Sequence, residues 1–176
     1  MNKKYELTAE TIEIDGRILH RIRALRDFSN VKAGDIGGYV ENESNLSHDG
    51  NCWIYNDAMV CDNARVFDNA RVFGNIWVCG NAQVCGNAWV FGNAQVCGNA
   101  WVSGNAQVYG NAWVFGYAQV SGNALVYGKA QVYGNARVFG NARIYGKARV
   151  YGNAWVYDNA QVCGNEQVSG DVMISA

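Results

Sequence analysis

The sequence predicts an all-β fold, a triangular β-solenoid with about 18 residues in each coil and about seven to eight coils. Three observations predict it. An aliphatic residue stands at every multiple of six from Ile54 to Ile174, twenty-one positions in succession. Alanine usually stands two positions earlier, and a Gly-Asn pair usually separates one unit from the next. Repetition of this kind indicates stacked coils in which each repeat contacts its neighbours.

Each six-residue unit is expected to form one short strand and one corner. Residues two apart on a strand share a face, so the alanine and the aliphatic side chain point inward together. Glycine and asparagine tolerate the positive φ of a tight corner. Three units then close one coil, and coils stack as parallel strands about 4.8 Å apart. The chain has no proline, which suits inner strands that need every backbone N–H. Corner asparagines 18 apart, such as Asn63, Asn81 and Asn99, are expected to hydrogen-bond in ladders.

The repeat unit resembles a known family. The stretch Val84-Cys85-Gly86-Asn87-Ala88-Trp89 is similar to the hexapeptide repeat of left-handed parallel β-helix proteins, which include many acyltransferases. This resemblance implies a left-handed coil. The period alone does not give the hand, since crossover connections are normally right-handed.

The first 36 residues lack the period and are interpreted as a separate segment, with the β-helix at 37–176. The stretch 12–18 predicts a β-hairpin with Asp15-Gly16 at its turn. We expect this hairpin to cap the first coil, because the end of a solenoid exposes unpaired strand edges. Val40, Leu46 and Ile54 are expected to form an irregular first coil with two extra residues near His48.

A second resemblance covers this entry region. The segments Asp27–Gly34, Gly37-Gly38, Asn45–Ser47 and Cys52–Tyr55 resemble the entry of bacterial and phage β-helix proteins labelled only as candidate transferases or hypothetical phage proteins. It implies a phage origin, and with it a role as a structural accessory or as an inhibitor of a host defence system.

Composition restricts the class of protein. No stretch approaches the roughly 18 apolar residues of a membrane span, and no apolar signal region follows the first residues. We therefore expect no membrane partner and a cytoplasmic location, in the host cytoplasm if a phage encodes the chain. The six cysteines are interpreted as reduced thiols.

Sorting the outward residues by 18 places an aromatic column on one face. The residues predicted to form an interface there are Trp53, Tyr55, Phe73, Trp89, Phe91, Tyr109, Tyr127 and Tyr145. Exposed apolar patches beyond a few hundred Å² usually mark binding surfaces. We expect this face to bind a second copy or another host or phage protein. Stacking of rings between coils explains the column equally well without any partner. The strand edge near Ala176, where no cap is recognised, is a second candidate surface for self-association.

A basic group follows in the later coils. It consists of Lys129, Arg137, Arg143, Lys147 and Arg149. Aromatic residues alternate with these cations, and no acidic residue occurs between Asp68 and Asp158. Such surfaces bind nucleotides, single-stranded nucleic acid or acidic proteins. The six-residue period spreads the group over all three faces, and the sequence pI near 6.1 is low for a nucleic-acid binder.

Cys61, Cys79 and Cys97 stand 18 apart and are expected to form an outward column. Neighbours in such a column are close enough for a disulfide. A linear set of thiols offers poor tetrahedral geometry for zinc, so no metal is expected. Reduced, disulfide-bonded and metal-bound forms of the column all remain open at this point. Cys52, at an inward position, is expected in the core.

The positions of the two histidines determine what we expect about catalysis. Hexapeptide acyltransferases use a histidine borne on the coils, often beside an extruded loop. His20 and His48 both precede the regular repeats, and residues 54–174 contain neither a histidine nor an insertion. A general base is therefore missing where that mechanism needs it. The leading hypothesis is a non-catalytic, homo-oligomeric scaffold or binding protein without a cofactor, and the alternative is a hexapeptide-repeat acyltransferase.

Overall fold

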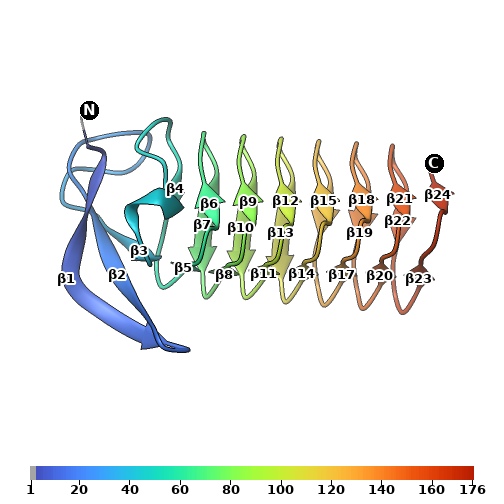
Figure 1. Ribbon diagram of the computed structural model, residues 1–176. Helices are drawn as coiled ribbons and strands as arrows, with labels where there is room; N and C mark the ends of the chain where they lie inside the picture. The colour runs from blue at the N-terminus through green and yellow to red at the C-terminus, as the bar shows by residue number, and fades with distance from the viewer. Residues whose placement is uncertain (1–2) are drawn as a thin grey trace.

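A computed structural model describes residues 3–176. Three sheets run along the axis of a prism, and the N-terminal hairpin lies at the end opposite the C-terminus (Figure 1). The long sheet contains β1 (Tyr5–Ile14), β2 (Arg17–Ala24), β3 (Ile36–Val40), β5 (Met59–Val60), β8 (Trp77–Val78), β11 (Gln95–Val96), β14 (Trp113–Val114), β17 (Gln131–Val132), β20 (Arg149–Val150) and β23 (Gln167–Val168).

The other two sheets take one strand from each coil. The aromatic sheet contains β4 (Trp53–Ile54), β7 (Arg71–Gly74), β10 (Trp89–Gly92), β13 (Gln107–Gly110), β16 (Leu125–Val126), β19 (Arg143–Ile144) and β22 (Gln161–Val162). The third sheet contains β6 (Arg65–Val66), β9 (Gln83–Val84), β12 (Trp101–Val102), β15 (Gln119–Val120), β18 (Arg137–Val138), β21 (Trp155–Val156) and β24 (Met173–Ile174). A short 3₁₀ helix, η1 (Glu43–Asn45), lies in the first coil.

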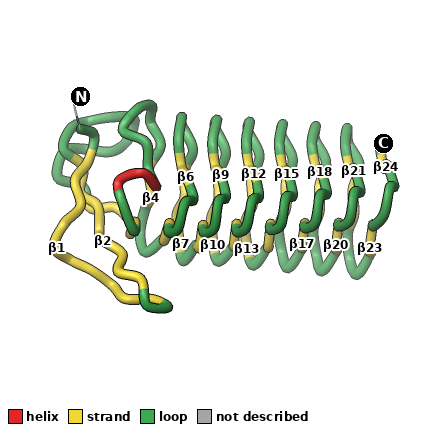
Figure 2. The backbone as a smooth tube through the Cα atoms, in the orientation of Figure 1, coloured by secondary structure: helices red, strands yellow, loops and turns green. Residues whose placement is uncertain are grey.

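The predicted period is confirmed. Coil strands pair in parallel with partners 18 residues away, as Val90 pairs with Val72 and Val108. Excluding the hairpin, the long sheet has eight strands, so the prism has about eight coils. Figure 2 shows short strands alternating with corners along its length. Within residues 3–176, no helix is long and apolar enough to cross a membrane.

Inward columns of alanine and valine form one continuous core. Each alanine and valine from Ala58 to Val156 at these positions is at most 1% exposed. Cys52 is also fully buried, as expected. Ile76 fills one alanine position. In the last coil Glu166 takes the equivalent position and is exposed, because no further coil of the described chain covers it.

Asparagine ladders hold the corners, as the spacing predicts. One ladder runs through Asn63, Asn81 and Asn99, with Nδ2 donating to Oδ1 of the next coil at 3.2 and 3.1 Å. Tyr117 interrupts it and is 64% exposed. A second, uninterrupted ladder contains Asn51, Asn69, Asn87, Asn105, Asn123, Asn141 and Asn159. An amide inside a ladder thus acts as both donor and acceptor between coils, as Asn81 does.

Aspartates replace the corner glycine at the N-terminal end. Asp62 and Asp68 have φ of +57° and +59°. Their Oδ2 atoms accept the backbone N–H of Gly80 and Gly86, at 2.9 and 3.0 Å. A side chain is tolerated at these corners because its carboxylate takes an N–H of the following coil.

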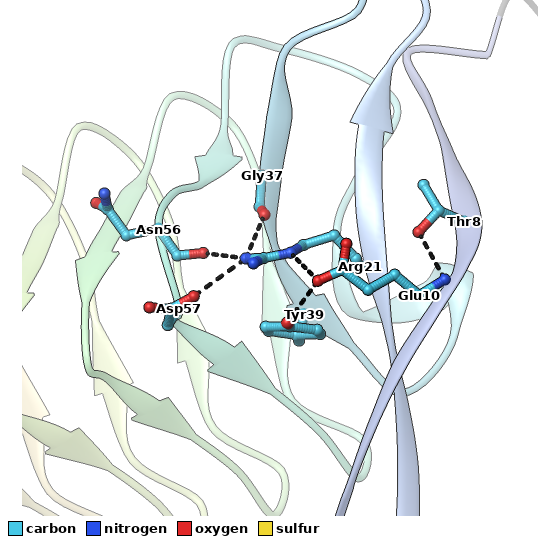
Figure 3. A network of polar contacts seen from close by, with 7 residues as sticks. All are labelled: Thr8, Glu10, Arg21, Gly37, Tyr39, Asn56 and Asp57. Atoms are coloured by element: carbon cyan, nitrogen blue, oxygen red, sulfur yellow. Dashed lines mark hydrogen bonds and ion pairs between the residues drawn. The ribbon is translucent and has the colours of Figure 1, made fainter.

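The hairpin of β1 and β2 turns at Asp15 and Gly16, both with positive φ. It joins the solenoid through β3, which pairs antiparallel with β2 and parallel with β5. Arg21 connects the hairpin to the first coil (Figure 3): its Nη1 donates to the carbonyl oxygens of Gly37 and Asn56, at 3.2 and 2.8 Å. The guanidinium also lies over the Tyr39 ring, at 4.2 Å from its centroid.

Candidate functional site

The aromatic sheet carries five rings stacked on successive coils. Neighbouring ring centroids are 4.6 to 5.1 Å apart and their planes are within 5° of parallel. The rings belong to Phe73, Phe91, Tyr109, Tyr127 and Tyr145. Each is half-buried, because its faces are covered by its neighbours. The structure thus brings together this part of the predicted interface, with ring edges forming its outer surface.

The expected position of Trp53 on this surface is wrong. Trp53 is 1% exposed, because N-terminal residues cover the start of the aromatic sheet. Its ring packs edge-on against Phe28 and Tyr5, with centroids 5.3 and 6.3 Å away. Tyr55 is half-buried, and its hydroxyl donates to Asn30 Oδ1 at 3.0 Å.

A depression of about 250 Å³ lies where the loop at Asn30 meets the aromatic sheet. Its lining residues are Asn30, Tyr55, Asn56, Arg71, Phe73 and Trp89. Arg71 donates to Ser29 Oγ at 3.0 Å and stacks on Trp89, 5.6 Å from its ring centroid. Trp89 is 40% exposed. It is the most accessible apolar group of the predicted interface.

The five basic residues do not form a single patch. Lys129 and Lys147 occupy equivalent corners on adjacent coils between the aromatic and long sheets, and Arg143 and Arg149 lie on the strands beside them. Arg137 lies on the third sheet and stacks on Trp155 at 4.9 Å. All five are exposed. None takes part in an ion pair within residues 3–176, so four unpaired cations border one edge of the prism.

The cysteine column is only partly outward. Cys61 is 2% exposed and packs with Leu19 and Tyr39, so its expected exposure is wrong. Burial raises the pKa of its thiol to about 12. Cys79 and Cys97 are half-buried free thiols with Sγ atoms 2.8 Å apart. The column therefore provides one thiol pair at the surface and one shielded thiol.

Both histidines contact the N-terminal strands. His20 lies on β2, with Nδ1 at 3.3 Å from the carbonyl oxygen of Thr8. His48 stacks on Tyr5 at 4.4 Å, and its Nδ1 accepts the backbone N–H of Lys4 at 3.2 Å. Burial lowers the pKa of His48, which favours its neutral form. Neither residue lies on the regular coils, as the sequence indicates.

Sequence reasoning missed a second depression, of about 240 Å³, on the long sheet. It is lined by Gln95, Cys97, Trp113, Val114 and Phe115. Trp113 is 45% exposed. The sequence does contain a signal for this depression. Trp113 comes 16 residues after Cys97, which places it one coil further along the same face. The loop at Asn30 left no such signal, because its contact with the aromatic sheet is not periodic.

Comparison with known proteins places the repeats in a family. The YdcK beta solenoid repeat model matches residues 64–80, 82–98, 94–106, 106–119, 118–130, 130–146 and 142–158. The chain is also 36% identical over 66 residues to a protein of Escherichia coli (strain K12) named "Uncharacterized acetyltransferase YdcK". That alignment covers 33% of this chain and 20% of the relative. The matched repeats span more than half of the sequence, and the chain therefore belongs to the YdcK β-solenoid repeat family.

Proposed function

We propose that the protein is a non-catalytic β-solenoid scaffold that associates with a second copy of itself through the aromatic sheet. The observation that carries this proposal is the ladder of stacked rings from Phe73 to Tyr145. The ladder offers a straight row of half-buried ring edges about 20 Å long, from four intervals of about 4.8 Å. Aromatic residues gathered in this way are typical of the buried centre of an interface.

A second copy suits this surface because a flat face pairs well with another flat face. Most homodimers are closed by a two-fold axis, which brings the same patch of each copy together. Beside the rings lie Gln107 and Leu125, both half-buried and uncharged. Among residues 3–176, the middle of the face therefore holds no ionised side chain that association would desolvate. Trp89, at 40% exposure, would lose the most apolar surface.

The proposal is tested by introducing one carboxylate in the middle of the face. Gln107→Glu places a charge beside the rings, and a two-fold axis would bring two such charges into one interface. Gln119→Glu is the matched control, because Gln119 holds the equivalent strand position on the third sheet and is also half-buried. Light scattering at micromolar concentration should show a wild-type dimer, a dimer for Gln119→Glu and at least about tenfold weaker association for Gln107→Glu.

A monomeric wild-type protein would refute self-association. Equal weakening by both substitutions would place the interface elsewhere. The edge of the third sheet at β24 would then be the next surface to test, by adding a charge at Met173, which is 64% exposed.

The basic edge gives the scaffold a second binding surface. Lys129 and Lys147 lie on adjacent coils with Arg149 beside them, and all three are exposed and free of ion pairs within the described chain. An acidic partner or a phosphate-bearing ligand would satisfy these cations. Loss of partner affinity in a Lys129→Gln/Lys147→Gln double variant, with the dimer intact, would assign binding to this edge.

Acetyl transfer is the alternative, and the name of the Escherichia coli relative favours it. The positions of the histidines weigh against it, because His20 and His48 contact the N-terminal strands and not an open face of the coils. An assay of thiol release from acetyl-CoA, with an amine acceptor present, separates the two functions. Turnover that is lost in His48→Asn while the dimer persists would replace the scaffold proposal with the enzyme.

A further inference from the structure

Cys79 and Cys97 occupy equivalent positions on neighbouring coils of the long sheet. Each follows the core valine of its strand, and the backbone N–H of Cys79 donates to the Val96 carbonyl at 3.0 Å. The two Sγ atoms are 2.8 Å apart, and both side chains are half-buried. The coil spacing of about 4.8 Å falls within the Cα separation of about 4.4–6.8 Å that a disulfide requires. The spacing of the two coils therefore meets the Cα criterion for a disulfide between this pair.

The two thiols differ in acidity. The hydrogen bond from the Cys79 thiol lowers the pKa of Cys97, against the opposing effect of burial. The same bond, together with burial, raises the pKa of Cys79. Cys97 is therefore the more acidic thiol of the pair, and Cys79 holds its proton more tightly. A thiolate is the form of cysteine that attacks disulfides.

Cys97 also opens onto the depression beside Trp113 and Phe115. Its volume of about 240 Å³ is slightly below that of sites for drug-sized ligands, about 300–1,000 Å³. It suits a single aromatic ring or a short alkyl group. The lining is apolar except for Gln95. A ligand held here by an apolar group would have its neighbouring atoms beside the Cys97 sulfur.

We propose that Cys79 and Cys97 form a redox-active dithiol that reduces small disulfides bearing an apolar group. The Cys97 thiolate attacks one sulfur of the ligand, a mixed disulfide forms, and the first ligand thiolate leaves and takes up a proton. Cys79 then loses its proton and attacks the Cys97 sulfur, which releases the second ligand thiol. The protein gains a Cys79–Cys97 disulfide and loses two electrons, and the ligand gains them as two thiols.

The other cysteines lack this combination. Cys52 and Cys61 are buried. Cys85 is 6% exposed, and its sulfur accepts the indole N–H of Trp101 at 3.0 Å. Cys163 is half-buried in the last coils. It serves as a matched control, because it is half-buried like Cys97 but has no neighbouring cysteine sulfur among the described hydrogen bonds.

The test uses the reduced full chain and a neutral aromatic disulfide, 2,2′-dithiodipyridine. Release of thiopyridone is followed by absorbance, and intact mass shows what remains on the protein. In the fast phase the wild type should release two thiopyridones and keep no adduct on the pair. Cys79→Ser should release one and keep the pyridyl adduct on Cys97. Cys97→Ser should lose the fast phase, slowing it at least about tenfold, and Cys163→Ser should keep it.

Trp113→Ala tests the depression separately. It should slow the reaction with the aromatic disulfide and leave the reaction with hydroxyethyl disulfide unchanged. A fast phase that survives in Cys97→Ser, or a wild-type protein that accumulates stable adducts on both Cys79 and Cys97, would overturn the proposal. The dithiol lies on the long sheet, so these results do not depend on self-association through the aromatic sheet.

Discussion

Replacing Gly122 by alanine should lower the free energy of unfolding by about 2–4 kcal/mol. Gly122 has φ of +67°, and a Cβ there would lie 2.9 Å from the backbone nitrogen of Gly140 in the next coil. The left-handed conformation costs an alanine about 1–2 kcal/mol. The backbone contact adds about 1–3 kcal/mol, because the close-packed coils must separate. A stiffer unfolded chain offsets about 0.4–1 kcal/mol of this loss.

Gly164 provides the control for the conformational part of the cost. Its φ is +62°, nearly the same, but an added Cβ would meet no atom of the described chain within 4 Å. Gly164→Ala should therefore lower the free energy of unfolding by only about 1 kcal/mol. This value is the cost of the left-handed conformation minus the gain from a stiffer unfolded chain. The comparison isolates the contact between coils from the backbone conformation that both glycines share.

Aspartate at position 122 tests the same contact in the opposite direction. Asp68 shows that a carboxylate at such a corner accepts the N–H of the next coil, since its Oδ2 is 3.0 Å from the Gly86 nitrogen. Gly122→Asp should thus recover about 1 kcal/mol relative to Gly122→Ala. Urea unfolding measures all three variants. Equal losses in Gly122→Ala and Gly164→Ala would refute the contact argument, and an aspartate no better than alanine would refute the hydrogen bond.

Two further predictions concern the N-terminal segment. Arg21→Gln removes the guanidinium that donates to the Gly37 and Asn56 carbonyls. The free energy of local opening of the hairpin should fall by about 2–3 kcal/mol, so its amide hydrogens should exchange faster than in the wild type. Unchanged exchange in β2 would contradict this. Burial lowers the pKa of His48 below its ordinary 6.5. At a pH just below 6.5 the unfolded chain therefore takes up a proton that the folded chain does not. The free energy of unfolding should fall as the pH drops through about 6.5. His48→Asn should flatten this dependence in urea unfolding at several pH values, since an amide does not titrate; an unchanged slope would assign it to another group.

The periodic part of the molecule could be predicted from the sequence because each residue's environment repeats every 18 positions. The inward place of Val90, the ladder through Asn63, Asn81 and Asn99, and the ring column all follow from that spacing. These features depend only on contacts between a coil and its neighbours. Secondary structure propensity contributes little, since most coil strands are only two residues long.

The two errors have one physical cause, which is contact with the non-periodic N-terminus. Trp53 and Cys61 stand at outward positions of their coils, yet Phe28 covers the first, and Leu19 and Tyr39 cover the second. Nothing in a six-residue period indicates where a hairpin or loop will fold back over a face. The depression at Arg71 was missed for the same reason, since Asn30 forms part of its lining.

The repeat also explains where the chemistry of this protein is expected. A residue on one coil lies beside the residue 18 positions later, so a side chain that occurs twice in succession becomes a pair, and one that recurs becomes a column. Two thiols at Cys79 and Cys97, two cations at Lys129 and Lys147, and the rings from Phe73 to Tyr145 all arise in this way. The inward alanines and valines are constrained by packing. Outward positions are free to change from coil to coil, and the long sheet changes from Cys97 to Phe115 within one turn. Where this column changes from cysteine to phenylalanine, the Cys97 sulfur lies beside an apolar surface, and we expect a small ligand to bind there.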